Sequence, residues 1–151
     1  MNGKGAYGRI SDRTPVLRLW DVLLVSVRGE LMDAEAEELS TEVLGEVHRW
    51  GPRGLVIDLS GAGLVDSHLC RVIADIAQGA ALMGTPSALS GLGPEIALAL
   101  ETMGVSFRGV RVTRTAEAAF ELFGVAPARL GSDENEDEEN VENEQEERVE
   151  P

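Results

Sequence analysis

The sequence predicts an α/β fold, with a mixed, mainly parallel sheet of about five strands and about four helices packed on it. Three observations lead to this class. Short apolar runs alternate with longer segments of helical periodicity, residues 55–57 form an unbroken apolar run, and glycine or proline separates the segments. Strand–helix–strand repetition implies right-handed crossovers, which make neighbouring strands parallel and leave the helices on the sheet faces.

The first elements are expected to be a β-hairpin, formed by residues 16–19 and 22–27 on either side of Trp20-Asp21. A helix follows over residues 35–50, because its apolar residues recur at spacings of three and four and so share one stripe. These residues are Ala36, Leu39, Val43, Val47 and Trp50. Asp33 is the predicted N-cap, and Gly51-Pro52 ends the helix.

The middle of the chain predicts a central strand and a second helix. Residues 55–57 are apolar without interruption, as expected for a strand buried on both faces. The helix runs from Ser67 to about Met83, with Gly84 placed to end it. Its apolar face comprises Leu69, Cys70, Ile73, Ile76, Ala77 and Ala80.

The last third of the domain repeats the alternation. A strand is expected over residues 87–92, followed by a helix that Pro94 opens and Gly104 ends. That helix should carry Ile96, Leu100 and Met103 inward. A short strand over residues 110–112 then precedes a final helix, which Thr115 caps and which runs through Phe120, Leu122 and Phe123.

Charge and composition divide the chain into a domain over residues 14–130 and two tails. Residues 1–13 are glycine-rich and read as a mobile arm. Residues 131–151 should be a disordered tail, since their like charges repel and no apolar burial offsets the entropy of ordering. Residues 133–150 carry −10 of the net charge of −14. Solubility and competition for a basic partner surface are the two roles considered for this tail.

Without its tail the chain is a mildly acidic domain, and neither nucleic acid nor an anionic membrane is a favoured partner. No run of about 18 apolar residues predicts a membrane span, and the N-terminus does not resemble a signal peptide. Cys70 is the single cysteine, which excludes an internal disulfide and a C-x-x-C pair. A cytoplasmic location is therefore expected.

Catalysis is disfavoured, and no metal or cofactor is expected. Asp58 and Asp66 could suggest a phosphoacceptor pair, but a receiver domain needs a lysine near its last strand and the only lysine is Lys4. A Ser67–His68 nucleophile and base is disfavoured, because adjacent helical residues point about 100° apart. The glycines match no phosphate-binding loop in a strand–turn–helix context.

Ser67 is the candidate functional residue. It follows the central strand and a glycine-containing loop, at the start of the second helix, where free N–H groups and the helix dipole favour negative charge. Phosphorylation there would add about −1.5 to −2 charges without unfolding the domain. The alternative is a hydroxyl that only supports the helix start, with Asp66 as the N-cap.

The span from Thr14 to Phe123 resembles a STAS domain, the family of bacterial anti-sigma-factor antagonists. The resemblance is carried by residues 56–60 and then Val65-Asp66-Ser67, which are similar to the strand, loop and Asp-Ser phosphorylation motif of the family. Within it, residues 15–19, 23–26, 82–84, 90–94 and 103–105 are similar to the RsbS-type stressosome scaffold subgroup. Asp66-Ser67-His68 departs from the Asp-Ser-Ser-Gly-Leu form of SpoIIAA-type antagonists.

This resemblance implies a non-catalytic scaffold that assembles with RsbR-type STAS paralogues and sequesters an RsbT-type serine/threonine kinase. Ser67 is the implied phosphorylation site, and its modification releases the kinase. The implied partner-binding residues are Asp66, Ser67 and His68, together with Gly63 and Asp33. The alternative is an anti-sigma-factor antagonist that binds an anti-sigma kinase directly.

Overall fold

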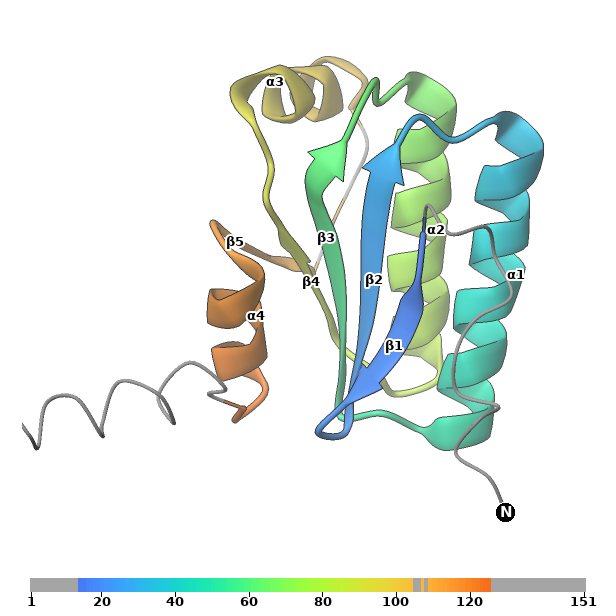
Figure 1. The fold of residues 1–151 in the computed structure, drawn as a ribbon, viewed down its shortest axis with the longest axis vertical. Coiled ribbons are helices and arrows are strands. Elements are labelled where there is room, and N and C mark those ends of the chain that lie inside the picture. The colour runs from blue at the N-terminus through green and yellow to red at the C-terminus, as the bar shows by residue number, and fades with distance from the viewer. Residues whose placement is uncertain (1–13, 105–106, 108, 126–151) are drawn as a thin grey trace, which may run out of the picture.

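A computed structural model of the protein describes residues 14–104, 107 and 109–125, which form five strands and four helices in the predicted order (Figure 1). The elements are β1 (Val16–Leu19), β2 (Val22–Gly29), α1 (Asp33–Trp50), β3 (Gly54–Ala62), α2 (Ser67–Leu82), β4 (Ser87–Ser90), α3 (Pro94–Thr102), β5 (Arg111–Thr113) and α4 (Ala116–Leu122). The predicted α/β class, with a mixed, mainly parallel sheet, is therefore confirmed. The N-terminal arm and the acidic tail lie outside the described residues.

The strands lie in the order β1-β2-β3-β4-β5, with β1 antiparallel to β2 and the remaining neighbours parallel. β3 is the central strand, and its apolar run at residues 55–57 is no more than 1% exposed. Helices α1 and α2 cover one face of the sheet, whereas α4 lies against the other (Figure 1). The carboxyl ends of β2, β3 and β4 consequently meet at one edge.

Two apolar cores result from this layering. The larger one lies between the sheet and helices α1 and α2. It contains most of the predicted apolar face of each helix, with Trp50 only partly buried. The smaller one packs Ala119 and Phe120 of α4 against Val22, Val56 and Ala88. The whole apolar face predicted for α2 is buried. Apolar packing therefore fixes the position of this helix and of the loop that leads into it.

The structure corrects several predicted boundaries. Met32, not Asp33, is the N-cap of α1. Asp33 is the first helical residue, where its carboxylate interacts favourably with the positive end of the helix dipole. The strand predicted over residues 87–92 ends at Ser90, because Gly91 turns the chain with φ of +72°. Met103 does not point inward; it follows the last residue of α3 and is 37% exposed.

A buried acid ties α1 to the edge strand β1. Glu46 is 8% exposed and accepts hydrogen bonds from Arg18, with Nη2 at 2.7 Å, and from Arg49. Burial alone would raise the pKa of Glu46, but the hydrogen bonds and charges of the two arginines outweigh it and hold the pKa below its ordinary value. The Arg18 guanidinium also lies 5.0 Å from the centre of the Trp50 ring.

Replacing Glu46 by glutamine should lower the free energy of unfolding by about 1 kcal/mol at neutral pH, since both arginines are partly exposed and their charges are screened. A depressed pKa in the folded state stabilises above the unfolded pKa, and this contribution is lost as pH falls through the folded pKa. The difference from the wild type should therefore shrink below about pH 4.5. Urea titrations at neutral and acidic pH measure it, with Glu38→Gln on the exposed face of α1 as the control. An undiminished difference in acid would contradict this origin.

The hairpin turn between β1 and β2 is formed by two residues with positive φ, Trp20 at 47° and Asp21 at 66°. Two-residue hairpin turns of this handedness favour Asn-Gly, and a bulky residue with positive φ is strained. The Trp20 side chain is 57% exposed, so little packing compensates for the strain. The Asp21–Arg53 ion pair, with a distance of 3.7 Å between Oδ2 and Nη2, is exposed and contributes little.

The double substitution Trp20→Asn/Asp21→Gly should therefore raise the free energy of unfolding by about 1 kcal/mol. Thermal and urea unfolding measure the gain. Trp20→Ala alone is the control, because alanine keeps a side chain at the strained position and should not stabilise. A double variant no more stable than the wild type would show that the turn stores no strain.

Candidate functional site

Ser67 lies where the chain passes from the central strand into α2. β3 ends at Ala62, residues 63–66 form the connecting loop, and Ser67 is the first helical residue. Its side chain is exposed and makes no hydrogen bond with the described residues. The hydroxyl is therefore presented to solvent at the edge where the parallel strands end.

The start of α2 is capped by Asp66. Its Oδ1 accepts a hydrogen bond from the Leu69 N–H at 2.8 Å, and its carbonyl accepts one from the Cys70 N–H at 3.1 Å. Asp66 is thus the N-cap of α2. The N–H groups of Ser67 and His68 have no hydrogen-bond partner among the described residues, so they face outward with the positive end of the helix dipole.

His68 connects the start of α2 to α1. Its Nε2 lies 3.4 Å from Glu37 Oε1 and 4.0 Å from Asp33 Oδ1. Asp33 and His68, both expected in the site, are therefore brought together from different helices. Glu37 was not anticipated, although its position four residues after Asp33 places the two on one face of α1.

The loop before α2 packs against the loop between β2 and α1. The Gly63 N–H donates to the Gly29 carbonyl at 2.9 Å, and a Cβ at Gly63 would lie 3.2 Å from Glu30 Cγ. A hollow of about 430 Å³ opens between the loops, with Met32 and Leu64 exposed at 69% and 70%. Its lining comprises Glu30, Leu31, Met32, Asp33, Ala34, Leu64 and Asp66. Two of the five expected site residues, Asp33 and Asp66, thus line a hollow that combines apolar and acidic groups.

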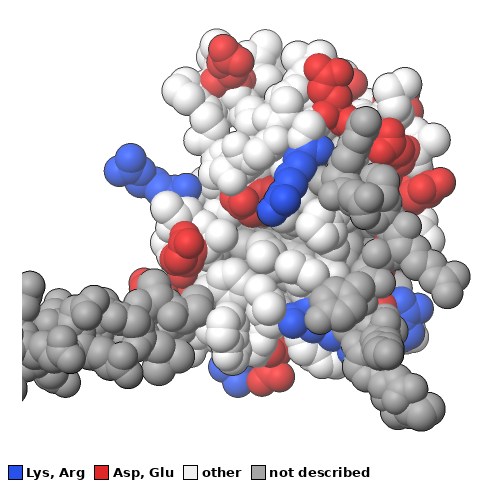
Figure 2. Space-filling model, viewed as in Figure 1, with Lys and Arg blue, Asp and Glu red and all other residues white. Residues whose placement is uncertain are grey.

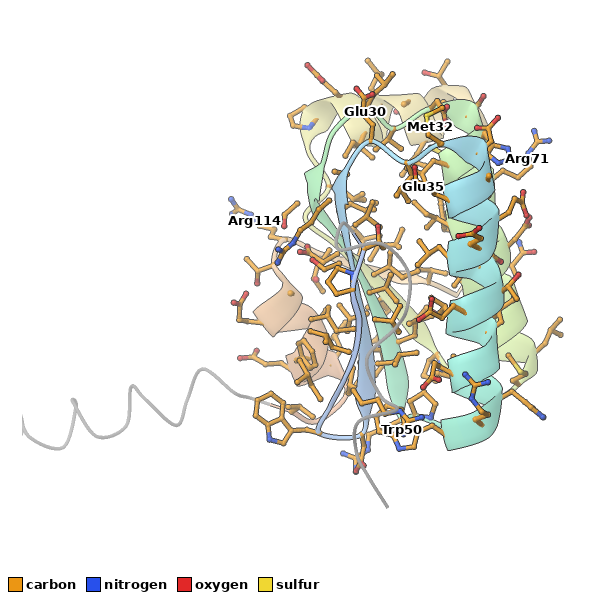
Figure 3. All side chains as sticks on the ribbon, turned by 45° about the vertical axis from the view of Figure 1, so that its right-hand side comes forward. Glu30, Met32, Glu35, Trp50, Arg71 and Arg114 are labelled. Carbon is orange, nitrogen blue, oxygen red and sulfur yellow. The ribbon has the colours of Figure 1, made fainter. Side chains whose placement is uncertain are left out.

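Charges are unevenly distributed around this end of the molecule. On the face seen in Figure 2, acidic side chains gather along the upper edge, above the carboxyl ends of β2 and β3. Glu30 and Met32 lie at that end in Figure 3, and Arg71 of α2 extends beside it. Arg114 lies on the opposite side of the molecule in the same view.

Asp58 and Cys70, the other two reactive groups noted in the sequence, are engaged in the fold: Asp58 in hydrogen bonds and Cys70 by burial. Asp58 Oδ1 accepts from Ser90 Oγ at 3.0 Å and Oδ2 from Ser60 Oγ at 2.7 Å, so this carboxylate joins β3 to β4. No group of three or more His, Cys, Asp or Glu side chains among the described residues is arranged to hold a metal ion. Burial, followed by the nearby Asp66 charge, raises the pKa of the buried Cys70 thiol. This thiol is poorly suited to act as a nucleophile.

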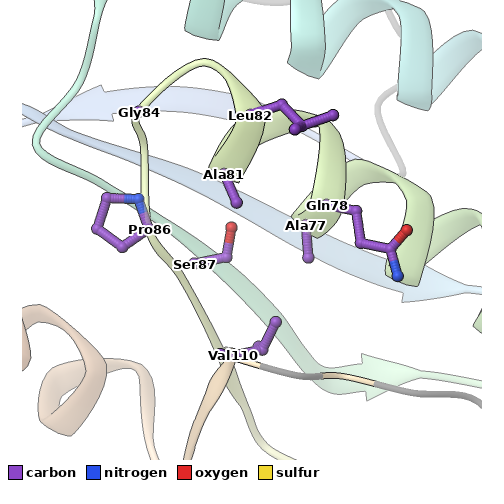
Figure 4. Close-up of a pocket in the computed structure, with 9 residues that line it drawn as sticks. Ala77, Gln78, Ala81, Leu82, Gly84, Pro86, Ser87 and Val110 are labelled. Carbon is purple, nitrogen blue, oxygen red and sulfur yellow. The ribbon is translucent and has the colours of Figure 1, made fainter.

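A second hollow, of about 580 Å³, lies beneath the other end of α2 (Figure 4). Ala77, Ala81, Pro86 and Val110 give it a mainly apolar lining, and Leu82 at its rim is 90% exposed. Because Ser67 begins α2, whereas the lining residues from this helix lie between Ala77 and Leu82, this hollow is toward the opposite end of α2 and forms no part of the candidate site.

Comparison with known proteins connects this geometry to one family. Residues 15–119 match the STAS domain model. The RsbT co-antagonist protein RsbRC of Bacillus subtilis (strain 168) is 29% identical over 106 residues, which cover 70% of this chain and 38% of RsbRC. The chain thus spans well under half the length of that relative.

Within the described residues, no helix combines the length and apolar character needed to span a bilayer.

Two solved structures extend the comparison. RsbS of Moorella thermoacetica, with one serine replaced by glutamate, is 29% identical with a TM-score of 0.68, covering 75% of this chain and 96% of that one. A chain from the molecular architecture of the stressosome, described as a signal integration and transduction hub, is 27% identical with a TM-score of 0.63. That match covers 73% of this chain and 96% of that chain.

Proposed function

Because this chain belongs to the STAS domain family, whose relatives include stressosome components, we propose that it is a phospho-regulated, non-catalytic scaffold of a stressosome-like assembly. In this proposal it acts in the cytoplasm with RsbR-type STAS paralogues and holds an RsbT-type serine/threonine kinase. The observation that carries the proposal is the exposed Ser67 hydroxyl, unpaired among the described residues, at the start of α2.

The surface around Ser67 supports a docking role. Met32 and Leu64 expose apolar side chains next to the hydroxyl-bearing end of α2, and the carboxylates of Asp33 and Asp66 border them. Apolar groups give a partner contact area, whereas the flanking charges fix its orientation. Gly63 has no side chain, and this allows the loop to lie close to Gly29 and Glu30. His68 lies between the two helices, with its Nε2 3.4 Å from Glu37 Oε1 of α1.

Phosphorylation would change this surface without changing the fold. The kinase transfers the γ-phosphoryl group of ATP to Ser67 Oγ, with loss of the hydroxyl proton and release of ADP. The product is a dianion next to Asp66, the N-cap of the same helix, on the surface that contacts the kinase. Burying that charge in a contact that accommodates a neutral hydroxyl requires removing its hydration, which weakens the complex, so the kinase is released. A phosphatase resets the site by hydrolysis.

The second candidate is an antagonist that captures an anti-sigma-factor kinase directly. Its support is the STAS family itself, because the Ser67 surface would serve equally well in a compact complex. The RsbT co-antagonist and stressosome relatives favour the scaffold. The two functions differ in the size of the complex that forms.

Mass spectrometry and light scattering test the proposal together. After incubation with an RsbT-type kinase and ATP, the phosphoryl group should map to Ser67, and the Ser67→Ala protein should remain unmodified. Mixing with an RsbR-type paralogue should give a megadalton assembly. Phosphorylation elsewhere, or a small complex that forms only with an anti-sigma kinase, would overturn the scaffold function.

A further inference from the structure

We infer that Arg71 is the counter-ion of the phosphorylated site: its guanidinium pairs with the phosphoryl group on Ser67, so that α2 carries both partners. The inference rests on the proposed modification of Ser67 and concerns how the modified state is held. It depends on the register of two side chains along one helix and on the charges that surround them.

Helical register places the two side chains on one face. Ser67 is the first residue of α2 and Arg71 follows four residues later, so they are neighbours on the helix surface, and both are exposed. Side chains on an α-helix lean toward its N-terminus. The long Arg71 side chain therefore extends over the turn that begins at Ser67. Asp75, four residues after Arg71, lies on the C-terminal side of the arginine, and the arginine leans away from it.

Arg71 is available for this contact. Within the part of the chain that the structure describes, it makes no hydrogen bond or ion pair, whereas Arg18 and Arg49 are bound to Glu46. A guanidinium binds phosphate oxygens through two parallel N–H groups, which gives shorter and stronger hydrogen bonds than neutral partners do. No existing contact of Arg71 with a described residue needs to break when the phosphoryl group arrives.

The surroundings of Ser67 make such a counter-ion necessary. Acidic groups predominate on the elements packed around the start of α2, and the nearest histidine, His68, is turned toward α1, 3.4 Å from Glu37. The charged or titratable groups at the start of α1 (residues 33–38) and in the loop before it are Glu30, Asp33, Glu35, Glu37 and Glu38. Those of α2 and its N-cap are Asp66, His68, Cys70, Arg71 and Asp75, and α3 carries Glu95 in its first turn. Arg28, at the end of β2, packs on Gly61 of the sheet. Arg71 is thus the arginine on α2 that can neutralise a dianion at Ser67.

The experiment is a phosphorus NMR titration of protein carrying phosphoserine at position 67, inserted during translation so that no kinase is needed. Four proteins are compared: the wild type, Arg71→Gln, Arg71→Lys and Arg114→Gln. Arg114 is the matched control because it is also exposed but lies on the opposite side of the molecule (Figure 3). The second pKa of the phosphate should rise by roughly half a unit in Arg71→Gln.

The remaining variants complete the test. Arg114→Gln should titrate as the wild type does, and Arg71→Lys should restore part of the lowering, because lysine supplies a point charge without the bidentate fork. Thermal unfolding verifies that all four proteins are folded. Equal pKa values in the wild type and Arg71→Gln would overturn the inference. A kinase that fails to modify Ser67 would instead refute the proposed function and leave this titration unaffected.

Discussion

Replacing Ser67 by aspartate should weaken binding of an RsbT-type kinase by about 100-fold or more, whereas Ser67→Ala should bind about as tightly as the wild type. The reason is the cost of removing the hydration of a charge in an interface that accommodates a neutral hydroxyl, which amounts to several kcal/mol when the kinase supplies no counter-ion of its own. Binding is measured by calorimetry or surface plasmon resonance on the purified proteins. Alanine separates loss of the hydroxyl from gain of a charge.

The fold should be unaffected by this substitution. An aspartate at the first helical residue lies near unpaired N–H groups and the positive end of the dipole, so the free energy of unfolding should stay equal or rise by a few tenths of a kcal/mol. Gln78→Glu adds the same charge to the exposed face of α2 near its other end and should bind the kinase normally. If Ser67→Asp bound as tightly as alanine, the electrostatic account of release would be wrong.

The overall fold was largely predictable because the spacing of apolar residues along the chain distinguishes its strands from its helices. The unbroken apolar run at residues 55–57 identified the central strand, since only a strand covered on both faces tolerates such a run. The spacing of apolar residues likewise identified α1 and α2, whose predicted faces are buried apart from Trp50. Here pattern and burial arise from the same hydrophobic effect.

Element ends were less predictable, because they depend on single residues. Met103 fits the helical spacing of its neighbours, but α3 ends one residue before it and leaves it partly exposed. Asp33 is a good capping residue by type, yet the backbone places Met32 at the cap, with Glu35 Oε1 3.4 Å from the Met32 N–H. Propensity ranks residues for a position but does not fix the register of the first turn.

The candidate site was predictable as a location but not as a set of contacts. The strand, loop and helix around Ser67 follow from local sequence, which also indicates the Asp66 cap. The contact between His68 and Glu37 requires the packing of α2 against α1, which sequence spacing within either helix does not contain. The hydrogen bond from Ser90 to Asp58 similarly depends on the register of β4 against β3.

The close pairing of β4 with β3 also predicts a large effect on stability. Replacing Gly91 by alanine should lower the free energy of unfolding by about 3 kcal/mol. Gly91 has φ of +72°, which a side chain makes unfavourable, and its Cβ would lie 2.6 Å from the Ser60 backbone nitrogen. The same Cβ would lie 2.7 Å from Asp58 Oδ1, the atom that accepts the hydrogen bond from Ser90 Oγ joining the ends of β3 and β4. Backbone at that distance cannot move aside as a flexible side chain does, so the strands must separate.

Gly93→Ala, two residues further along the same loop, is the matched control. Gly93 has φ of −81° and open space around the position of a Cβ, so the substitution should lower the free energy of unfolding by no more than about 1 kcal/mol, the cost of alanine in place of glycine at the N-cap of α3. Urea unfolding of both variants separates a general sensitivity of the loop from the close approach at Gly91. Because β3 leads directly into the Ser67 loop, hydrogen exchange in Gly91→Ala should also rise at residues 60–66. Equal stability of the two variants would mean that the Asp58 and Ser60 contacts do not hold this edge of the sheet, and that the Ser67 loop is positioned by α2 alone.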